Sequence, residues 1–177
     1  MLMSYTSGEF PLDSSVNMPP IYDSYAPPRT VDGQAVNLVL WDTSGKKEYT
    51  KFRVSSYPDT DVFLVAFSVV DRSSLASVAR EWVPEIEEAC GKSRFVLVGC
   101  KADLREDPGV LRELEARNES PVSYEEALQA SQHVGATTYM ECSALTQEGL
   151  TPLFDAALHA ALQPPPQTPP DNPCSVL

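Results

Sequence analysis

Apolar residues in this chain gather in short runs rather than in one long segment. The runs at 61–70 and 95–99 are apolar on both faces, and an apolar stretch begins at Val36 and stops abruptly at Asp42. Continuous apolar runs such as the first two are typical of parallel strands that helices cover on both sides. We therefore predict strands at these three places, and the last strand at 138–142.

Apolar residues also recur at helical spacing, after residues that suit a helix start. The first predicted helix carries Leu75, Val78, Trp82 and Ile86 and is capped by Ser73 or Ser74. The other three helices are predicted at 110–117 after Asp107-Pro108, at 125–134 after Ser123, and at 151–162, beginning with Thr151-Pro152. Strands that alternate with helices predict a doubly wound α/β fold. The ligand of such a fold lies at the carboxyl ends of its strands.

The first part of the chain carries weaker signals. Residues 4–25 show little periodicity and several prolines, so we expect a loop there after a short helical remnant. Pro27 and Pro28 confine any strand at 25–31 to a sheet edge, because proline has no N–H for a ladder. Asp32-Gly33 predicts a two-residue hairpin turn.

Composition narrows the class of partner. The 177 residues, 42% of them hydrophobic, suffice for one globular domain with a tail. Thirteen basic against 25 acidic residues give a charge of −12, which argues against nucleic acid and against adsorption to anionic lipid. The four cysteines form no C-x-x-C pair, and the N-terminus shows no signal peptide, so we expect a reducing, cytosolic compartment. No apolar run is long enough to span a bilayer.

Three strand ends carry residues suited to nucleotide chemistry. Asp42, at the end of the stretch that begins at Val36, can hold a magnesium-bound water, and the backbone N–H of Gly45 can approach a γ-phosphate. After 95–99, Asp103 can accept from guanine N1–H and the exocyclic amine while the stem of Lys101 lies along the ring. After 138–142, the backbone N–H groups of the turn at 143–145 can meet guanine O6. Each site alone also fits an ordinary turn or helix cap, but the three in this order favour a GTPase.

The chain resembles Rho-family small GTPases of the Rac and Cdc42 kind. The resemblance rests on Val31–Leu38, Trp41–Thr43, Ser56–Leu64, Glu141–Gln147 and the terminal Cys174–Leu177. It implies a small GTPase domain of the P-loop NTPase type over 1–163, with a Rho-type insert at about 105–120, and a proline-rich tail over 164–177.

The same resemblance implies site residues, ligands and partners. The implied ligands are GTP or GDP with Mg²⁺. Phe10 would pack against the guanine edge, Lys101 and Asp103 would read the base, and Ser143 and Ala144 would support it. Asp42 and Gly45 would face magnesium and the γ-phosphate. The implied partners are effectors, exchange factors, GTPase-activating proteins and a dissociation inhibitor. The implied role is a signalling switch that acts on the actin cytoskeleton and cell shape.

The chain departs from the family pattern in several places. It contains no G-x-x-x-x-G-K-[ST], so the family's first strand and phosphate loop are expected to be absent. Without that strand, its two neighbours would lose a ladder partner on facing edges. Without the phosphate loop, nucleotide binding is expected to be weak. Pro20 stands where the family has a magnesium-ligating threonine, and the preceding loop, 12–18, is about three residues longer than in Rac-like proteins. Lys46 stands at the position of the water-orienting glutamine and, as a pure donor, predicts slow hydrolysis. Cys100 replaces an asparagine or threonine.

The tail predicts lipid attachment. Cys174-Ser175-Val176-Leu177 is a C-a-a-X box, and leucine in last place favours geranylgeranylation of Cys174. The expected location is the cytoplasmic face of the plasma or internal membranes, with a cytosolic pool, because a single lipid without basic residues binds reversibly. Residues 166–169 form a P-x-x-P that can meet an SH3 domain or act as a stiff spacer.

Two functions therefore remain open from the sequence. One is a Rho-type GTP-binding switch, of which these residues are a truncated product or an incomplete gene model. The other is a non-catalytic relative that binds effectors or regulators.

Overall fold

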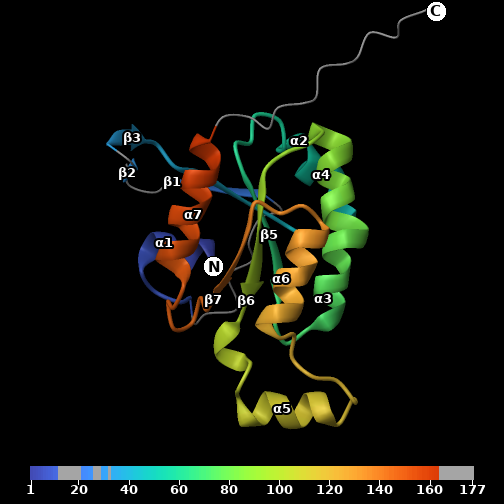
Figure 1. Ribbon diagram of the computed structural model, residues 1–177. Helices are drawn as coiled ribbons and strands as arrows, with labels where there is room; N and C mark the ends of the chain where they lie inside the picture. Colours follow the sequence, from blue (N-terminus) through green and yellow to red (C-terminus); the bar gives the residue numbers. More distant parts are fainter. Residues whose placement is uncertain (12–20, 26–28, 32, 164–177) are drawn as a thin grey trace, which may run out of the picture.

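The centre of the molecule is a parallel sheet with helices on both faces (Figure 1). The computed structural model describes residues 1–11, 21–25, 29–31 and 33–163. The three strands β5 (Phe63–Ser68), β6 (Phe95–Cys100) and β7 (Thr138–Cys142) lie in the order β5-β6-β7 and pair in parallel. The strands predicted at 61–70, 95–99 and 138–142 are thus confirmed.

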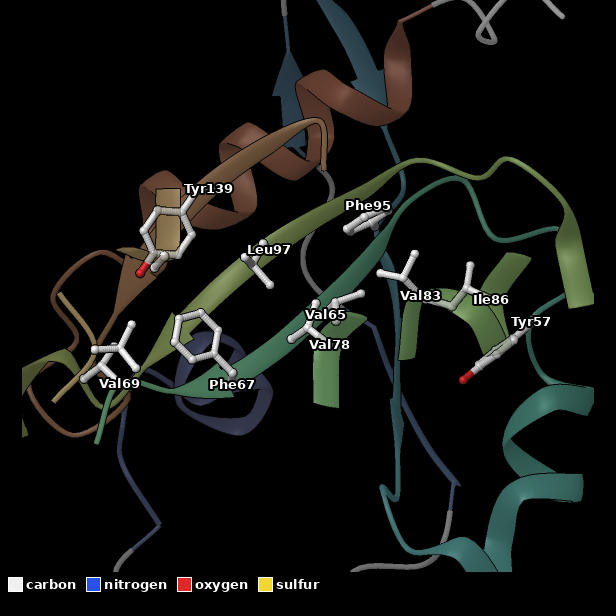
Figure 2. Packing of buried hydrophobic residues seen from close by; sticks show 12 residues of the cluster. Tyr57, Val65, Phe67, Val69, Val78, Val83, Ile86, Phe95, Leu97 and Tyr139 are labelled. Carbon is white, nitrogen blue, oxygen red and sulfur yellow. The ribbon is translucent and has the colours of Figure 1, made fainter. Parts of the chain in front are cut away.

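Side chains of β5 and β6 alternate between two cores. Val65 and Phe67 of β5 lie with Phe95 and Leu97 of β6 in one core, where Figure 2 shows them beside Val78, Val83 and Ile86. This core is covered by α3 (Arg72–Ser77), α4 (Val83–Cys90) and α6 (Tyr124–His133). The apolar runs therefore bury both faces of the sheet, as the continuous pattern predicts.

The second core lies on the opposite face of the sheet. There Val96 and Val98 pack against α7 (Leu150–Leu162) and α1 (Leu2–Ser7). The rings of Tyr5 in α1 and Phe154 in α7 stack with centroids 3.7 Å apart. The expectation that residues 4–25 form a loop is therefore wrong at this end, because packing against α7 holds a short helix that periodicity alone does not show.

Most predicted helix starts are confirmed. Asp107 caps α5 (Pro108–Glu115), Ser123 and Glu126 form the capping box of α6, and α7 begins at Leu150, one residue before the predicted start. The predicted cap at Ser73 or Ser74 is wrong. The Asp71 carboxylate accepts from the N–H groups of both serines and caps α3, and a π-helical turn, Val78–Trp82, then joins α3 to α4.

Two small antiparallel pairs complete the described structure. β1 (Ile21–Tyr25) pairs with β4 (Val39–Thr43), and β2 (Arg29–Val31) pairs with β3 (Gln34–Val36) across the predicted hairpin turn, of which Asp32 lies outside the described residues. The strand predicted from Val36 is thus divided into β3 and β4, and the expectation of a loop over 21–25 is wrong. Within the described ranges, no ladder joins β4 to β5. The short helices η1 (Lys47–Tyr49), α2 (Thr50–Ser55) and η3 (Ala102–Leu104) connect these elements.

Gly149, which precedes α7, is expected to tolerate no side chain. Its φ is +73°, and a Cβ there would lie 2.2 Å from the Glu141 carbonyl oxygen, whereas Gly135 has a similar φ of +72° with no atom within 4 Å of a Cβ. Gly135→Ala should lower the free energy of unfolding by about 1 kcal/mol through backbone strain alone. Gly149→Ala should cost about 1 kcal/mol more because of the added clash. Urea unfolding of both variants measures the difference, and equal costs would contradict the close approach of Gly149 to β7.

Candidate functional site

The carboxyl ends of β6 and β7 bring two predicted loops together. Cys100 and Cys142 are partners in the β6–β7 register, so Lys101–Asp103 and Ser143–Ala144 leave the sheet side by side.

Lys101 has an unusual backbone conformation. Its φ and ψ are 60° and 39°, in the left-handed region, and it stands directly before η3, which contains the half-buried Asp103. A non-glycine residue in this region costs of the order of 1–3 kcal/mol and is common where a site needs a particular chain direction. The strained residue turns the chain sharply after β6.

The loop after β7 is held by its own hydrogen bonds. Ser143 is fully buried, its Oγ accepts from the Thr146 N–H at 3.1 Å, and its N–H donates to the Glu148 carbonyl at 2.9 Å. Gln147 Nε2 donates to the Ala144 carbonyl at 3.1 Å. Ser143 therefore acts through the shape of the loop, because its hydroxyl is already engaged within it.

An ion pair that the sequence analysis missed fastens the two loops. Arg105 Nη1 donates to Glu141 Oε2 at 2.6 Å, and Arg105 Nε donates to the Val122 carbonyl at 3.1 Å. The Tyr139 hydroxyl donates to Glu141 as well. Burial raises the pKa of Glu141, but the hydrogen bonds from Arg105 and Tyr139 outweigh it and hold that pKa below its usual value. The carboxylate thus stays ionised between β7 and the segment after η3.

A cavity of about 480 Å³ lies beside η3 and the end of β7, next to Glu148 and Gly149 at the start of α7. Its lining includes Asp103, Arg105, Glu141 and Cys142. Its volume is in the range of small-molecule sites. The predicted base-reading residue Asp103 therefore faces a space at the carboxyl end of the parallel sheet, where ligands of such folds lie.

Asp42 lies in β4, one residue before that strand ends at Thr43, and Gly45 follows the strand. Desolvation raises the pKa of Asp42, an effect that the Met1 ammonium group opposes. No cluster of three acidic, histidine or cysteine ligands occurs within the described part of the chain. A single carboxylate still fits Mg²⁺, which usually takes one or two protein carboxylates and completes its shell with water and phosphate.

A second buried ion pair, also missed from the sequence, holds the loop after Asp42. Arg53 in α2 donates through Nε and Nη2 to both carboxylate oxygens of Glu85 in α4, at 2.8 and 2.7 Å. Its Nη1 donates to the Ser44 carbonyl at 2.6 Å, and its guanidinium lies 5.1 Å from the centre of the Trp82 ring. Arg53 thereby ties the loop that runs from Asp42 past Gly45 to α4.

The structure does not bring the remaining predicted residues into contact with Lys101 or Asp103 within the described ranges. Lys46 is exposed just before η1, and its carbonyl accepts from Arg53 Nη1 at 3.3 Å. Phe10 follows α1 and is 40% exposed, and no described contact links it to Lys101 or Asp103. Pro20 and Cys174 lie outside the described residues.

Two of the predicted carboxylates have chemistry that suits a nucleotide, Asp103 after the central strand β6 and Asp42 in β4 of a separate sheet. The carboxylate of Asp103 beside a cavity suits a base with two adjacent N–H donors, and Asp42 suits a hydrated magnesium ion. A comparison with protein families agrees with this chemistry. The family model described as Ras family matches residues 1–163.

Proposed function

The chain belongs to the Ras family of small GTPases, and we propose that it is a Rho-type member that turns bound GTP over slowly. Membership of the family implies a GTP-binding switch in signalling. The observation that carries the proposal is the pairing of Cys100 with Cys142, because it sets Lys101 and Asp103 beside the loop of Ser143. A base held between the two loops would meet groups from both strands.

Each loop has a separate part in base recognition. The Asp103 carboxylate accepts from guanine N1–H and from the exocyclic amine, and the Lys101 stem covers the ring. The N–H of Ala144 donates to O6, in a loop whose shape the buried Ser143 maintains. Phe10 packs at the edge of the base. Adenine presents neither the N1–H nor O6, so this set of groups selects guanine.

The Rho-type assignment is supported by the segment at 105–120. Its helix α5 (Pro108–Glu115) lies away from the sheet and from the other helices (Figure 1). Asp107 caps this helix through the N–H groups of Gly109 and Val110, both at 2.9 Å. A separately capped helix at this point of the chain is the feature that the resemblance to Rho proteins leads us to expect.

Hydrolysis of GTP is expected to be slow because of Lys46. A glutamine can accept a hydrogen from the attacking water, whereas an ammonium group only donates. In a single-turnover assay of the full-length protein, the rate should stay below that of ordinary Rho proteins. Lys46→Gln should recover only a small part of the difference, since the catalytic groups act as a unit. Lys47→Gln is the matched control and should change nothing, and a normal rate in the unaltered protein would show that Lys46 does not occupy the glutamine position.

Membrane attachment is expected to depend on Cys174. No helix in the described portion is long and apolar enough to cross a bilayer. We propose that a geranylgeranyl group on Cys174 holds the protein reversibly at the cytoplasmic face of membranes, with a cytosolic pool. Cys174→Ser should move the protein wholly into the cytosolic fraction, and Cys90→Ser, on α4, should not. Unchanged partitioning of the Cys174 variant would refute the lipid anchor.

A second candidate function is a non-catalytic relative that binds effectors or regulators. Trp41 in β4 and Phe52 in α2 are 54% and 59% exposed, which leaves both side chains available to a partner protein. If the protein is a switch, its further partners are exchange factors, GTPase-activating proteins and a dissociation inhibitor. An SH3 domain is a further partner for residues 166–169. Pull-down of an effector with GTP-loaded and with nucleotide-free protein separates the two functions. A switch binds only when loaded, whereas a non-catalytic binder does not distinguish the two states.

A further inference from the structure

The strands β6 and β7 end on two cysteines that face each other. Cys100 and Cys142 are register partners, and both contact the core on the α7 face of the sheet. Paired residues of neighbouring strands project to the same face, with the strands about 4.8 Å apart. A disulfide requires Cα atoms roughly 4.4–6.8 Å apart. The spacing of the two strands is therefore within the Cα range that a disulfide spans.

The two thiols have different environments. Cys142 is 2% exposed, whereas Cys100 is half-buried and so accessible to small molecules. Hydrogen bonding with Cys142, together with the charges of Met1 and Lys101, lowers the pKa of Cys100 although burial opposes the shift. The same hydrogen bond and burial raise the pKa of Cys142. Cys100 thus has the character of a nucleophile, since the thiolate is the reactive form, and Cys142 remains a protonated neighbour.

We propose that Cys100 and Cys142 form a dithiol site that a hydroperoxide oxidises to an intramolecular disulfide across the ends of β6 and β7. The Cys100 thiolate attacks one peroxide oxygen, the O–O bond breaks, and Cys100 becomes a sulfenic acid while the leaving hydroxide takes up a proton as water. Cys142 then gives up its thiol proton, its sulfur attacks the Cys100 sulfur, and hydroxide leaves to form a second water. Two thiols and one hydrogen peroxide give one disulfide and two waters.

The bond would join the residues that immediately precede Lys101 and Ser143. If the guanine base lies between the two loops, which rests on the function proposed above, the disulfide would fix the separation of its two sides. The modification itself does not require that function. Cys90 serves as an internal comparison because it ends α4 against the other core and has no cysteine register partner.

The test is oxidation of the chain that carries Cys90→Ser and Cys174→Ser, so that only the pair remains. After hydrogen peroxide treatment and alkylation, intact mass spectrometry should show monomers that have lost two hydrogen atoms and take up no alkyl groups. Peptide mapping should find the Cys100 and Cys142 peptides joined, and dithiothreitol should restore both thiols. Two alkylatable thiols after a dose that oxidises free cysteine would overturn the proposal, as would disulfides formed only between molecules.

Two further variants of the same background assign the roles. With Cys142→Ser, dimedone should trap a sulfenic acid at Cys100 in nearly every molecule, and with Cys100→Ser, dimedone should label almost nothing. Circular dichroism before oxidation confirms that both variants fold. Labelling of Cys142 rather than Cys100 would contradict the assigned roles. No readout uses a nucleotide, so failure here and failure of guanine binding are separate results.

Discussion

Replacing Arg53 with methionine is expected to lower the free energy of unfolding by about 3 kcal/mol. The side chain of Arg53 is 5% exposed and that of Glu85 is 20% exposed, so the change leaves a largely buried carboxylate without its charged partner. Only the Tyr57 hydroxyl, which donates to Glu85 Oε1 at 2.6 Å, still hydrogen-bonds to it. The change also removes the hydrogen bond to the Ser44 carbonyl. The partial exposure of Glu85 keeps the expected cost at the lower end for broken buried pairs. Denaturant unfolding followed by circular dichroism measures it.

Lys51→Met is the matched control for this change. Lys51 lies in the same helix, α2, and is exposed, so the same substitution there should cost less than about 0.5 kcal/mol. Glu85→Met should be nearly as costly as Arg53→Met, and the double variant should cost less than the sum of the two. Simple additivity would mean that the ion pair does not hold α2 to α4.

Replacing Asp103 with alanine is expected to weaken guanine nucleotide binding by two to four decades. The change removes an acceptor of two hydrogen bonds from the base, each worth about 1.5–3 kcal/mol when one partner is charged, or about 3–6 kcal/mol together. Titration of the full-length protein with a fluorescent GDP analogue measures the loss. Binding of an adenine nucleotide, already weak, should not fall further.

Glu113→Ala is the control for the Asp103 variant. Glu113 is an exposed carboxylate on α5, so its loss changes the net charge equally without touching the β6 and β7 loops. The nucleotide affinity of the Glu113→Ala variant should stay within about twofold of that of the unaltered protein, a difference well under 1 kcal/mol. An equal loss in both variants would point to overall charge rather than to base recognition by Asp103.

Local sequence signals predicted the centre of the fold well. Continuous apolar runs located β5 and β6, and the capping chemistry of Ser123 and Asp107 located α6 and α5. These signals act within a few residues. The helix α1 was expected only as a short remnant, because its extent to Ser7 depends on the stacking of Tyr5 on Phe154, which lies near the other end of the chain.

The candidate site was predictable only in part for the same reason. The strand ends placed Lys101, Asp103 and Ser143 beside one another once the β6–β7 register followed from the fold. The ion pairs Arg53–Glu85 and Arg105–Glu141 join residues 32 and 36 positions apart, and each glutamate looks like an ordinary surface charge in the sequence. The cap residue of α3 was predicted wrongly because Asp71, Ser73 and Ser74 are all suited to cap a helix and stand within four positions of one another.

The central claim is that a guanine base lies between the loops that follow β6 and β7. The most direct test is a titration of the isotope-labelled 177-residue chain with GDP and Mg²⁺, followed by the amide resonances in two-dimensional NMR, with ADP and Mg²⁺ in parallel. This readout detects weak as well as tight binding. The account predicts that GDP shifts the resonances of Lys101–Asp103 and Ser143–Leu145 together, that ADP does not, and that Asp103→Ala abolishes the difference. Equal shifts with GDP and ADP, or GDP-specific shifts confined to other parts of the chain, would contradict it.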